Sequence, residues 1–185
     1  MDEIVMPSCI FSGKILTGER VAHVSRDVGS IREIFGSPEA VGERQAAGTA
    51  YVVSSYMPQR EGTPGGLCFG ITHLYPGKVG DEYYMTKGHY HARIETAEFY
   101  WGIEGEGMLI LMDRERRVWA ERMFPGSLHY IPGGVAHRVA NTGGAMLSFG
   151  ACWPSDAGHD YGSIGRTGFA ARLRCVDGEP KLVRP

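Results

Sequence analysis

The sequence has few of the features that mark membrane-embedded, secreted or nucleic-acid-binding proteins. Its 185 residues include no apolar run close to the roughly 20 residues that a membrane-spanning helix needs. The N-terminal segment MDEIVMPSCIF has neither the basic flank nor the apolar stretch of a signal peptide. Lysine and arginine form no long run, and the net charge is −2. We therefore expect a cytoplasmic protein that binds neither nucleic acid nor a membrane.

Cysteine is scarce as well, and its spacing indicates no function. The four cysteines are scattered and form no C-x-x-C pair: Cys9, Cys68, Cys152 and Cys175. Structural disulfide frameworks and zinc knuckles are marked by cysteines at short, regular spacings. We therefore expect four reduced thiols, and the chemistry of this protein must lie in other residue types.

Short apolar segments separated by turn-forming segments make up most of the sequence. Beyond residue 48, strand-like segments such as GLCFGITHLY and GMLILMD alternate with segments such as PGKVGD and NTGG. This even spacing predicts an all-β sandwich or barrel. Helix is predicted only over residues 25–36 and after Pro38, and the C-terminal segment predicts a hairpin that turns at Asp177–Gly178. No linker or repeat is visible, so we expect one domain over residues 1–185.

The clearest candidate for chemistry is a histidine pair followed by two glutamates. His89 and His91 are two residues apart, so a strand would point both imidazoles the same way, about 6–7 Å from each other. Imidazole and carboxylate ligands suit a divalent transition metal. Either Glu95 or Glu98 can complete such a set. We prefer Glu98, because it begins the apolar segment EFYWGI, whereas Glu95 lies in the polar segment RIETAE.

A second motif, PGSLHYIPGGVAHRVAN at residues 125–141, contributes a third histidine. The spacing of its glycines, proline, histidine and asparagine matches the second sequence signature of the cupin superfamily, in which His137 takes the place of the metal-binding histidine. The first cupin signature joins a His-x-His pair to a glutamate and a glycine. Glu95 fits the spacing of that signature, with Gly102 at the glycine position. Glu98 gives a rival register with a longer spacing and Gly105 at the glycine position.

The resemblance is more specific than the superfamily. The segments LYPGKVGDEYYMTKGHYHARIETAE and WPSDAGHDYG resemble those of the cupin-type phosphoglucose isomerases, and the similarity is strong from Thr72 to Gly162. It implies a single cupin β-barrel with short N-terminal helices and a metal-binding core at about residues 67–155. In that family the glutamate ligand stands farther from the histidine pair than in most cupins, which matches Glu98. The implied metal ligands are His89, His91, Glu98 and His137.

The same resemblance implies a sugar-phosphate site. The positions that it carries over are Tyr51, Thr72, Thr86, Gly88, Tyr100, Trp153, His159 and Tyr161. Trp153 departs from the family, which tends to have tyrosine there; an indole N–H donates a hydrogen bond but accepts none. In a regular strand Thr86 would face away from the histidine pair, so we expect the chain to break or bulge at Lys87–Gly88. We expect Lys87 itself to be a solvated surface lysine, and a phosphate ligand is the alternative.

The activity that the resemblance implies is metal-dependent isomerisation of glucose 6-phosphate and fructose 6-phosphate, in glycolysis or gluconeogenesis. Glu98 and His137 are the implied catalytic residues, with Glu98 as the base of an enediol route; a hydride shift is the alternative route. Fe²⁺ is the expected metal, and Mn²⁺, Co²⁺, Ni²⁺ or Zn²⁺ would also fit these ligands. Members of the family are homodimers, so we expect a homodimer. Two other functions fit the same ligands: a cupin dioxygenase and a non-catalytic sugar- or metal-binding cupin.

Overall fold

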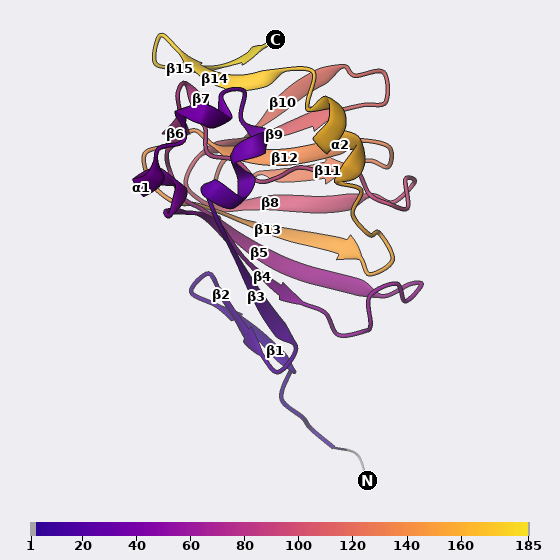
Figure 1. The fold of residues 1–185 in the computed structure, drawn as a ribbon. Coiled ribbons are helices and arrows are strands. Elements are labelled where there is room, and N and C mark those ends of the chain that lie inside the picture. The colour runs from indigo at the N-terminus through magenta and orange to yellow at the C-terminus, as the bar shows by residue number, and fades with distance from the viewer. Residues whose placement is uncertain (1–2, 185) are drawn as a thin grey trace.

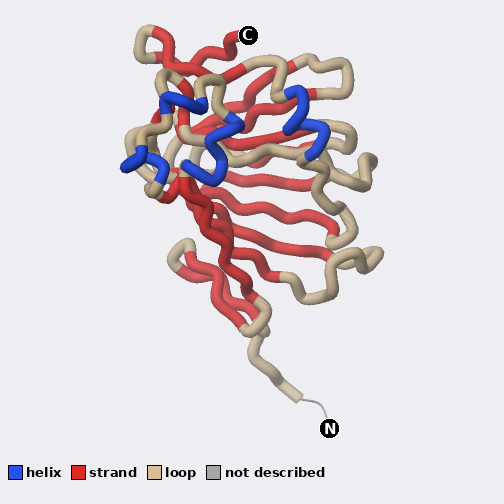
Figure 2. The backbone as a smooth tube through the Cα atoms, viewed as in Figure 1, coloured by secondary structure: helices blue, strands red, loops and turns tan. Residues whose placement is uncertain are grey.

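Antiparallel sheets make up most of the regular secondary structure in the computed structural model, which describes residues 3–184, and Figure 2 shows that strands far outnumber helices. The largest sheet has six strands, in the order β11 (Leu128–Ile131), β8 (Glu98–Glu104), β13 (Leu147–Pro154), β5 (Leu67–Leu74), β4 (Thr49–Tyr56) and β3 (Val21–Asp27). In Figure 1 these strands form a twisted stack that ends at β3, beside the N-terminal hairpin. The all-β prediction is confirmed.

Smaller sheets complete the fold. One has the order β10 (Val118–Met123), β9 (Gly107–Met112) and β12 (Ala136–Asn141). Another has the order β15 (Glu179–Val183), β14 (Arg172–Val176), β7 (Glu82–Tyr83) and β6 (Lys78–Val79). The hairpin of β1 (Cys9–Ser12) and β2 (Ile15–Gly18) is a sheet of its own. The predicted C-terminal hairpin is confirmed, since Asp177 and Gly178 join β14 to β15 and both have positive φ, as a tight two-residue turn requires.

The helices are short, and most of them lie near the N-terminus, as predicted. They are η1 (Gly29–Ile34), η2 (Pro38–Ala40), α1 (Glu43–Ala46) and α2 (Gly162–Thr167). The helix expected over residues 25–36 begins later than predicted, because residues 25–27 continue β3. Asp27 ends the strand: its carboxylate accepts a hydrogen bond from the Ser30 N–H at 2.7 Å. Among the described residues, no helix is long and apolar enough to cross a membrane.

The inner face of the six-stranded sheet lines a cavity. Because side chains alternate along a strand, every second residue points inward. Tyr51 and Val53 of β4, Thr72 of β5 and Phe149 of β13 all border this cavity. The buried apolar side chains of β9 and β12 belong to the hydrophobic core. The main sheets are hydrogen-bonded separately, so over residues 3–184 the barrel is open rather than closed.

The segment between β7 and β8 runs beside β12 and carries an irregularity. Isolated bridges pair Met85 with Ala140 and His89 with His137. Between them Gly88 has a φ of +67°, and a Cβ added there would lie 2.9 Å from a ring carbon of Phe169. Both the backbone angle and the packing therefore require glycine. The predicted break at Lys87–Gly88 is confirmed, and residues on both sides of it border the same cavity.

Candidate metal centre and substrate cavity

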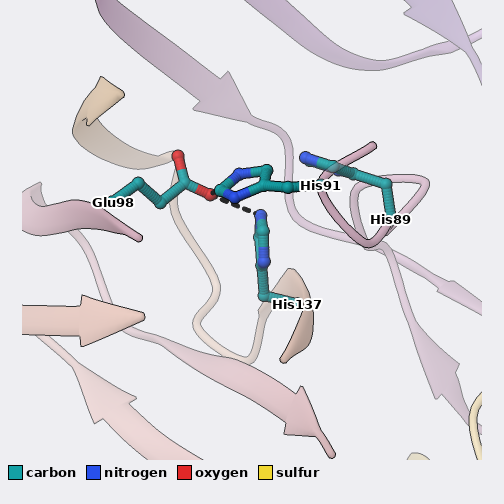
Figure 3. Close-up of side chains that lie close together, drawn as sticks. All are labelled: His89, His91, Glu98 and His137. Carbon is teal, nitrogen blue, oxygen red and sulfur yellow. Dashed lines mark ion pairs between the residues drawn. The ribbon is translucent and has the colours of Figure 1, made fainter. Parts of the chain in front are cut away.

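Four side chains from separate segments converge on one point. Each of His89, His91, Glu98 and His137 offers a ligand atom, and these atoms all lie within 4.8 Å of one another. The Oε1 atom of Glu98 is 3.3 Å from Nε2 of His91 and 2.5 Å from Nε2 of His137. Figure 3 shows the Glu98 carboxylate directed toward the rings of His91 and His137, with His89 beside them. The structure thus brings together all four residues whose spacing suggested a metal site.

Backbone pairing explains why these residues meet. The N–H of His89 donates to the C=O of His137 at 3.2 Å, and the N–H of His137 donates back to the C=O of His89 at 3.1 Å. The two imidazole centroids are consequently 4.4 Å apart. His91 follows two residues after His89, so its ring reaches the same side of the chain. Glu98 arrives from the start of β8, where it pairs with Ile131 of β11.

Backbone carbonyls fix the orientation of two of the imidazoles. Nδ1–H of His91 donates to the C=O of Thr96 at 2.8 Å, and Nδ1–H of His137 donates to the C=O of Val135 at 3.3 Å. A hydrogen bond at Nδ1 leaves the Nε2 lone pair free to bind a metal. In both rings it is Nε2 that faces Glu98. The rings are therefore held in the tautomer that a metal site needs.

The burial and charge of this group fit a bound cation. Burial and the neighbouring His137 ring lower the pKa of His89 to about 2, so this imidazole is neutral at physiological pH. Burial raises the pKa of Glu98, but His137 and His91 more than offset that effect, and the net pKa lies well below its usual range. Oε1 of Glu98 and Nε2 of His137 are buried without a hydrogen-bond partner. Buried polar atoms are rarely left in this state, and three imidazoles with one carboxylate suit a divalent transition metal.

Glu95, the alternative glutamate, lies outside this group. Its side chain is 66% exposed, and its carboxylate accepts a hydrogen bond from Nε of Arg93 at 3.0 Å. The residue belongs to the connection before β8 and not to the strand itself. Its surroundings are those of a solvated surface ion pair.

The cavity beside the four residues has a volume of about 350 Å³. All eight positions that the sequence assigned to a sugar-phosphate site border it: Tyr51, Thr72, Thr86, Gly88, Tyr100, Trp153, His159 and Tyr161. The four candidate metal ligands border it too. A ligand in this cavity can therefore reach both the metal site and a lining rich in hydroxyl groups.

Local packing sets the position of two aromatic residues in this cavity. Tyr100 stands edge-on to His137, with the ring centroids 5.6 Å apart. Burial raises the pKa of Tyr100 well above its usual value, and the nearby Glu98 charge adds to this effect, so the phenol keeps its proton. Trp153 lies over Gly70, where an added Cβ would come within 3.0 Å of the indole. Glycine at that position makes room for the larger ring that Trp153 brings.

The rings of His159 and Tyr161 form a stacked pair next to the ring of His89. Their rings are parallel to within 3°, with centroids 5.5 Å apart, and the His159 centroid is 4.5 Å from that of His89. Backbone hydrogen bonds between Tyr90 and Asp160 hold this loop against the metal-site segment. The loop after β13 therefore places aromatic rings against His89.

Two cations at the cavity were not assigned to the site from the sequence. Lys87 is exposed, as expected, yet it also borders the cavity, and its Nζ lies 4.5 Å from the centroid of the Tyr161 ring. Arg26 borders the cavity from β3, where it pairs with Tyr51 of β4. The alternation of VAHVSRD places Arg26 on one face of a strand, but only the pairing with β4 shows which face that is.

Comparison with known proteins agrees with this geometry. A protein-family model described as Glucose-6-phosphate isomerase (GPI) matches residues 26–184. The glucose-6-phosphate isomerase of Thermococcus gammatolerans is 41% identical over 160 residues, which cover 86% of this chain and 84% of the relative. The enzyme of the same name from Thermococcus kodakarensis is 46% identical over 132 residues, covering 71% of this chain and 70% of the relative.

Comparison with solved structures shows only a weak similarity in fold. Oxalate decarboxylase from Bacillus subtilis superposes with a TM-score of 0.46 and 17% identity, over 60% of this chain and 26% of that chain. This value is too low to support an argument about function. The match to the family model and to the Thermococcus enzymes decides the assignment: the chain belongs to the glucose-6-phosphate isomerase (GPI) family.

Proposed function

We propose that this protein is a metal-dependent glucose-6-phosphate isomerase, which interconverts glucose 6-phosphate and fructose 6-phosphate. One observation carries the proposal. Three histidines and a glutamate, two of which have buried atoms without a hydrogen-bond partner, border a cavity that several hydroxyl groups line and whose size suits a small ligand. Membership of the family supports the choice of reaction.

The proposed metal ligands are His89, His91, Glu98 and His137, and Fe²⁺ is the proposed metal, with Mn²⁺, Co²⁺, Ni²⁺ or Zn²⁺ as alternatives. When bound, the metal supplies positive charge to two neighbouring oxygens of the sugar. With a bound divalent cation, three neutral imidazoles and one carboxylate would leave the site with a net positive charge. The carbonyls of Thr96 and Val135 keep the rings of His91 and His137 in place.

The reaction moves one hydrogen between C2 and C1, and we assign this transfer to Glu98. In the enediol route its carboxylate accepts the proton from C2 of glucose 6-phosphate. The C–H electron pair forms the C1=C2 double bond, and the π pair of the C1=O bond moves onto O1. The proton that O2 loses passes to O1, and Glu98 returns its own proton to C1, so that atoms and electrons balance. His137, whose Nε2 lies 2.5 Å from Oε1 of Glu98, would hold the metal beside this carboxylate.

A hydride shift from C2 to C1 is the alternative route, and it needs no base. The two routes differ in what happens to the migrating hydrogen. The reaction in deuterated water separates them: the enediol route incorporates solvent deuterium into the product, whereas a hydride shift retains the original hydrogen completely.

The phosphate and hydroxyl groups of the substrate need hydrogen-bond donors. We propose that the hydroxyls of Thr72, Thr86 and Tyr161 and the backbone N–H of Gly88 supply them. The Oγ1 atom of Thr86 accepts a hydrogen bond from the N–H of Val139 at 3.1 Å, so its own hydrogen is available for a ligand. Tyr51, Tyr100, Trp153 and His159 complete the proposed lining.

An assay on glucose 6-phosphate, with and without a chelator, tests the proposal. We expect turnover that stops on chelation and returns when Fe²⁺ is added. The dioxygenase alternative predicts metal-dependent uptake of O₂ instead, although the hydroxyl-rich lining does not suit an apolar substrate. Sugar binding without turnover would favour the non-catalytic alternative. Either of these last two results would overturn the isomerase proposal.

We further propose a cytoplasmic homodimer whose 185 residues form one domain. The four free cysteines support a reducing compartment. An apolar patch on the outer face of β8 and β11 supports a partner: Phe99, Leu128 and Tyr130 are 45%, 68% and 56% exposed, and Phe99 is paired with Tyr130. Sedimentation at micromolar concentration tests this, and a monomer would contradict it.

A further inference from the structure

Lys87 is an exposed residue that borders the cavity, and we take its position as the mouth of the cavity. It stands two residues before His89, and its Nζ is 4.5 Å from the Tyr161 centroid. Among residues 3–184, no carboxylate lies within ion-pair distance of its ammonium group. The charge of Lys87 is therefore not neutralised by the protein.

Arg26 borders the same cavity from β3, which is an edge strand of the six-stranded sheet. It faces Tyr51 across the β3–β4 ladder, and both side chains border the cavity. Burial raises the pKa of Tyr51, while the backbone N–H of Lys87 and the charge of Arg26 counteract that rise. The Arg26 charge also acts on Tyr161. Arg26, Lys87, Tyr51 and Tyr161 all border the cavity, and we refer to these four residues as one cluster.

The distribution of charge around the cavity is uneven. Its acidic lining residues are Glu98, which belongs to the candidate metal site, and Glu61. Its lysine and arginine lining residues are Lys87 and Arg26, and within the described residues neither forms an ion pair. The mouth of the cavity thus presents two cations without a carboxylate partner, while the metal site occupies another part of the wall.

We propose that Arg26 and Lys87 form a two-cation clamp that binds the phosphate monoester of the substrate and so selects phosphorylated over neutral sugars. This inference rests on the proposed function, because it places the sugar carbons at the metal site and the phosphate at the mouth. The guanidinium of Arg26 can bind two phosphate oxygens at once, and the ammonium of Lys87 adds a point charge. The hydroxyl of Tyr161 lies in the same cluster and can donate to the same group.

Steady-state kinetics of the metal-loaded protein test the clamp. We expect Arg26→Gln and Lys87→Gln each to raise the KM for glucose 6-phosphate about tenfold or more, because each removes a hydrogen bond to a charged group. The kcat of each variant should change much less, since neither side chain is a metal ligand. Arg26→Lys, which keeps the charge but not the planar fork, should give an intermediate KM.

Arg122→Gln is the matched control. Arg122 is an exposed arginine on β10 that does not border the cavity, so its removal changes the net charge equally but should leave KM unchanged. Circular dichroism and melting curves of all variants confirm that each is folded. If Arg26→Gln and Lys87→Gln together leave KM within twofold of the parent, the clamp is overturned.

A binding measurement separates the clamp from the isomerase proposal. Calorimetric titration of the metal-loaded protein with inorganic phosphate, and with glucose as an uncharged probe, needs no turnover. We expect the double variant to bind phosphate at least tenfold more weakly and to bind glucose as the parent does. If the parent has no isomerase activity but this difference is present, the isomerase proposal fails and the clamp stands. Equal phosphate affinity in the parent and the double variant would refute the clamp.

Discussion

Gly88 offers a test of how the backbone builds the candidate metal site. Alanine at this position must adopt a φ near +67°, which costs about 1–2 kcal/mol for a residue with a Cβ. The new Cβ would also lie 2.9 Å from the Phe169 ring and 3.1 Å from Cβ of Arg138, and overpacking of this kind costs about 1–3 kcal/mol. We therefore expect Gly88→Ala to lower the free energy of unfolding by about 2–5 kcal/mol.

Urea unfolding of the metal-free protein measures this loss, with an unchanged m-value showing that the unfolded state is unaltered. Gly178→Ala is the matched control, because Gly178 also has a positive φ, +84°, but an added Cβ there meets nothing within 4 Å. We expect that variant to lose only the backbone part, about 1–2 kcal/mol. If Gly88→Ala is no more destabilising than Gly178→Ala, the packing argument at Gly88 is wrong.

Three further predictions concern the site and the buried charges. Glu98→Gln should reduce isomerase turnover about 10²-fold or more and should weaken metal binding. Glu95→Gln should leave both turnover and metal affinity within twofold of the parent. Steady-state kinetics and metal titration measure the two quantities. Metal loading should raise the melting temperature, because a ligand at 1,000 times its Kd adds about 4 kcal/mol to the stability of the folded state. Scanning calorimetry measures this, and an unchanged melting temperature would contradict metal binding by the folded state. Glu82→Gln breaks a buried ion pair with Arg172 at 3.1 Å and should lower the free energy of unfolding in urea by about 3–5 kcal/mol. Asp81→Asn removes a surface ion pair with Arg174 and should lower it by less than about 1 kcal/mol. Equal losses for the two variants would contradict this reading of the buried charge.

Much of the candidate site was predictable because its signals are local. The spacing of His89 and His91 already placed both rings on one side, and the position of Glu98 at the start of an apolar segment distinguished it from Glu95. The need for a break at Gly88 followed from where Thr86 had to point. The period of a strand and the freedom of glycine supported these predictions, but the placement of Thr86 in the site came from the family resemblance.

Other parts depended on long-range pairing that residue types do not specify. Arg26 reaches the cavity only because β3 pairs with β4 in the register that sets Arg26 opposite Tyr51. The carbonyls of Thr96 and Val135 orient the imidazoles, but every residue carries a carbonyl, so the sequence could not name them. The start of the first helix was misplaced because strand pairing extends β3 to Asp27.

Metal content and turnover, measured on the same samples, test the central claim most directly. The protein and its His137→Ala variant would be stripped with a chelator, reloaded with Fe²⁺, and assayed for bound metal and for isomerisation of glucose 6-phosphate. The account predicts one metal per chain and chelator-reversible turnover in the parent, with both much reduced in the variant. Full isomerase turnover by the stripped, metal-free protein would contradict it.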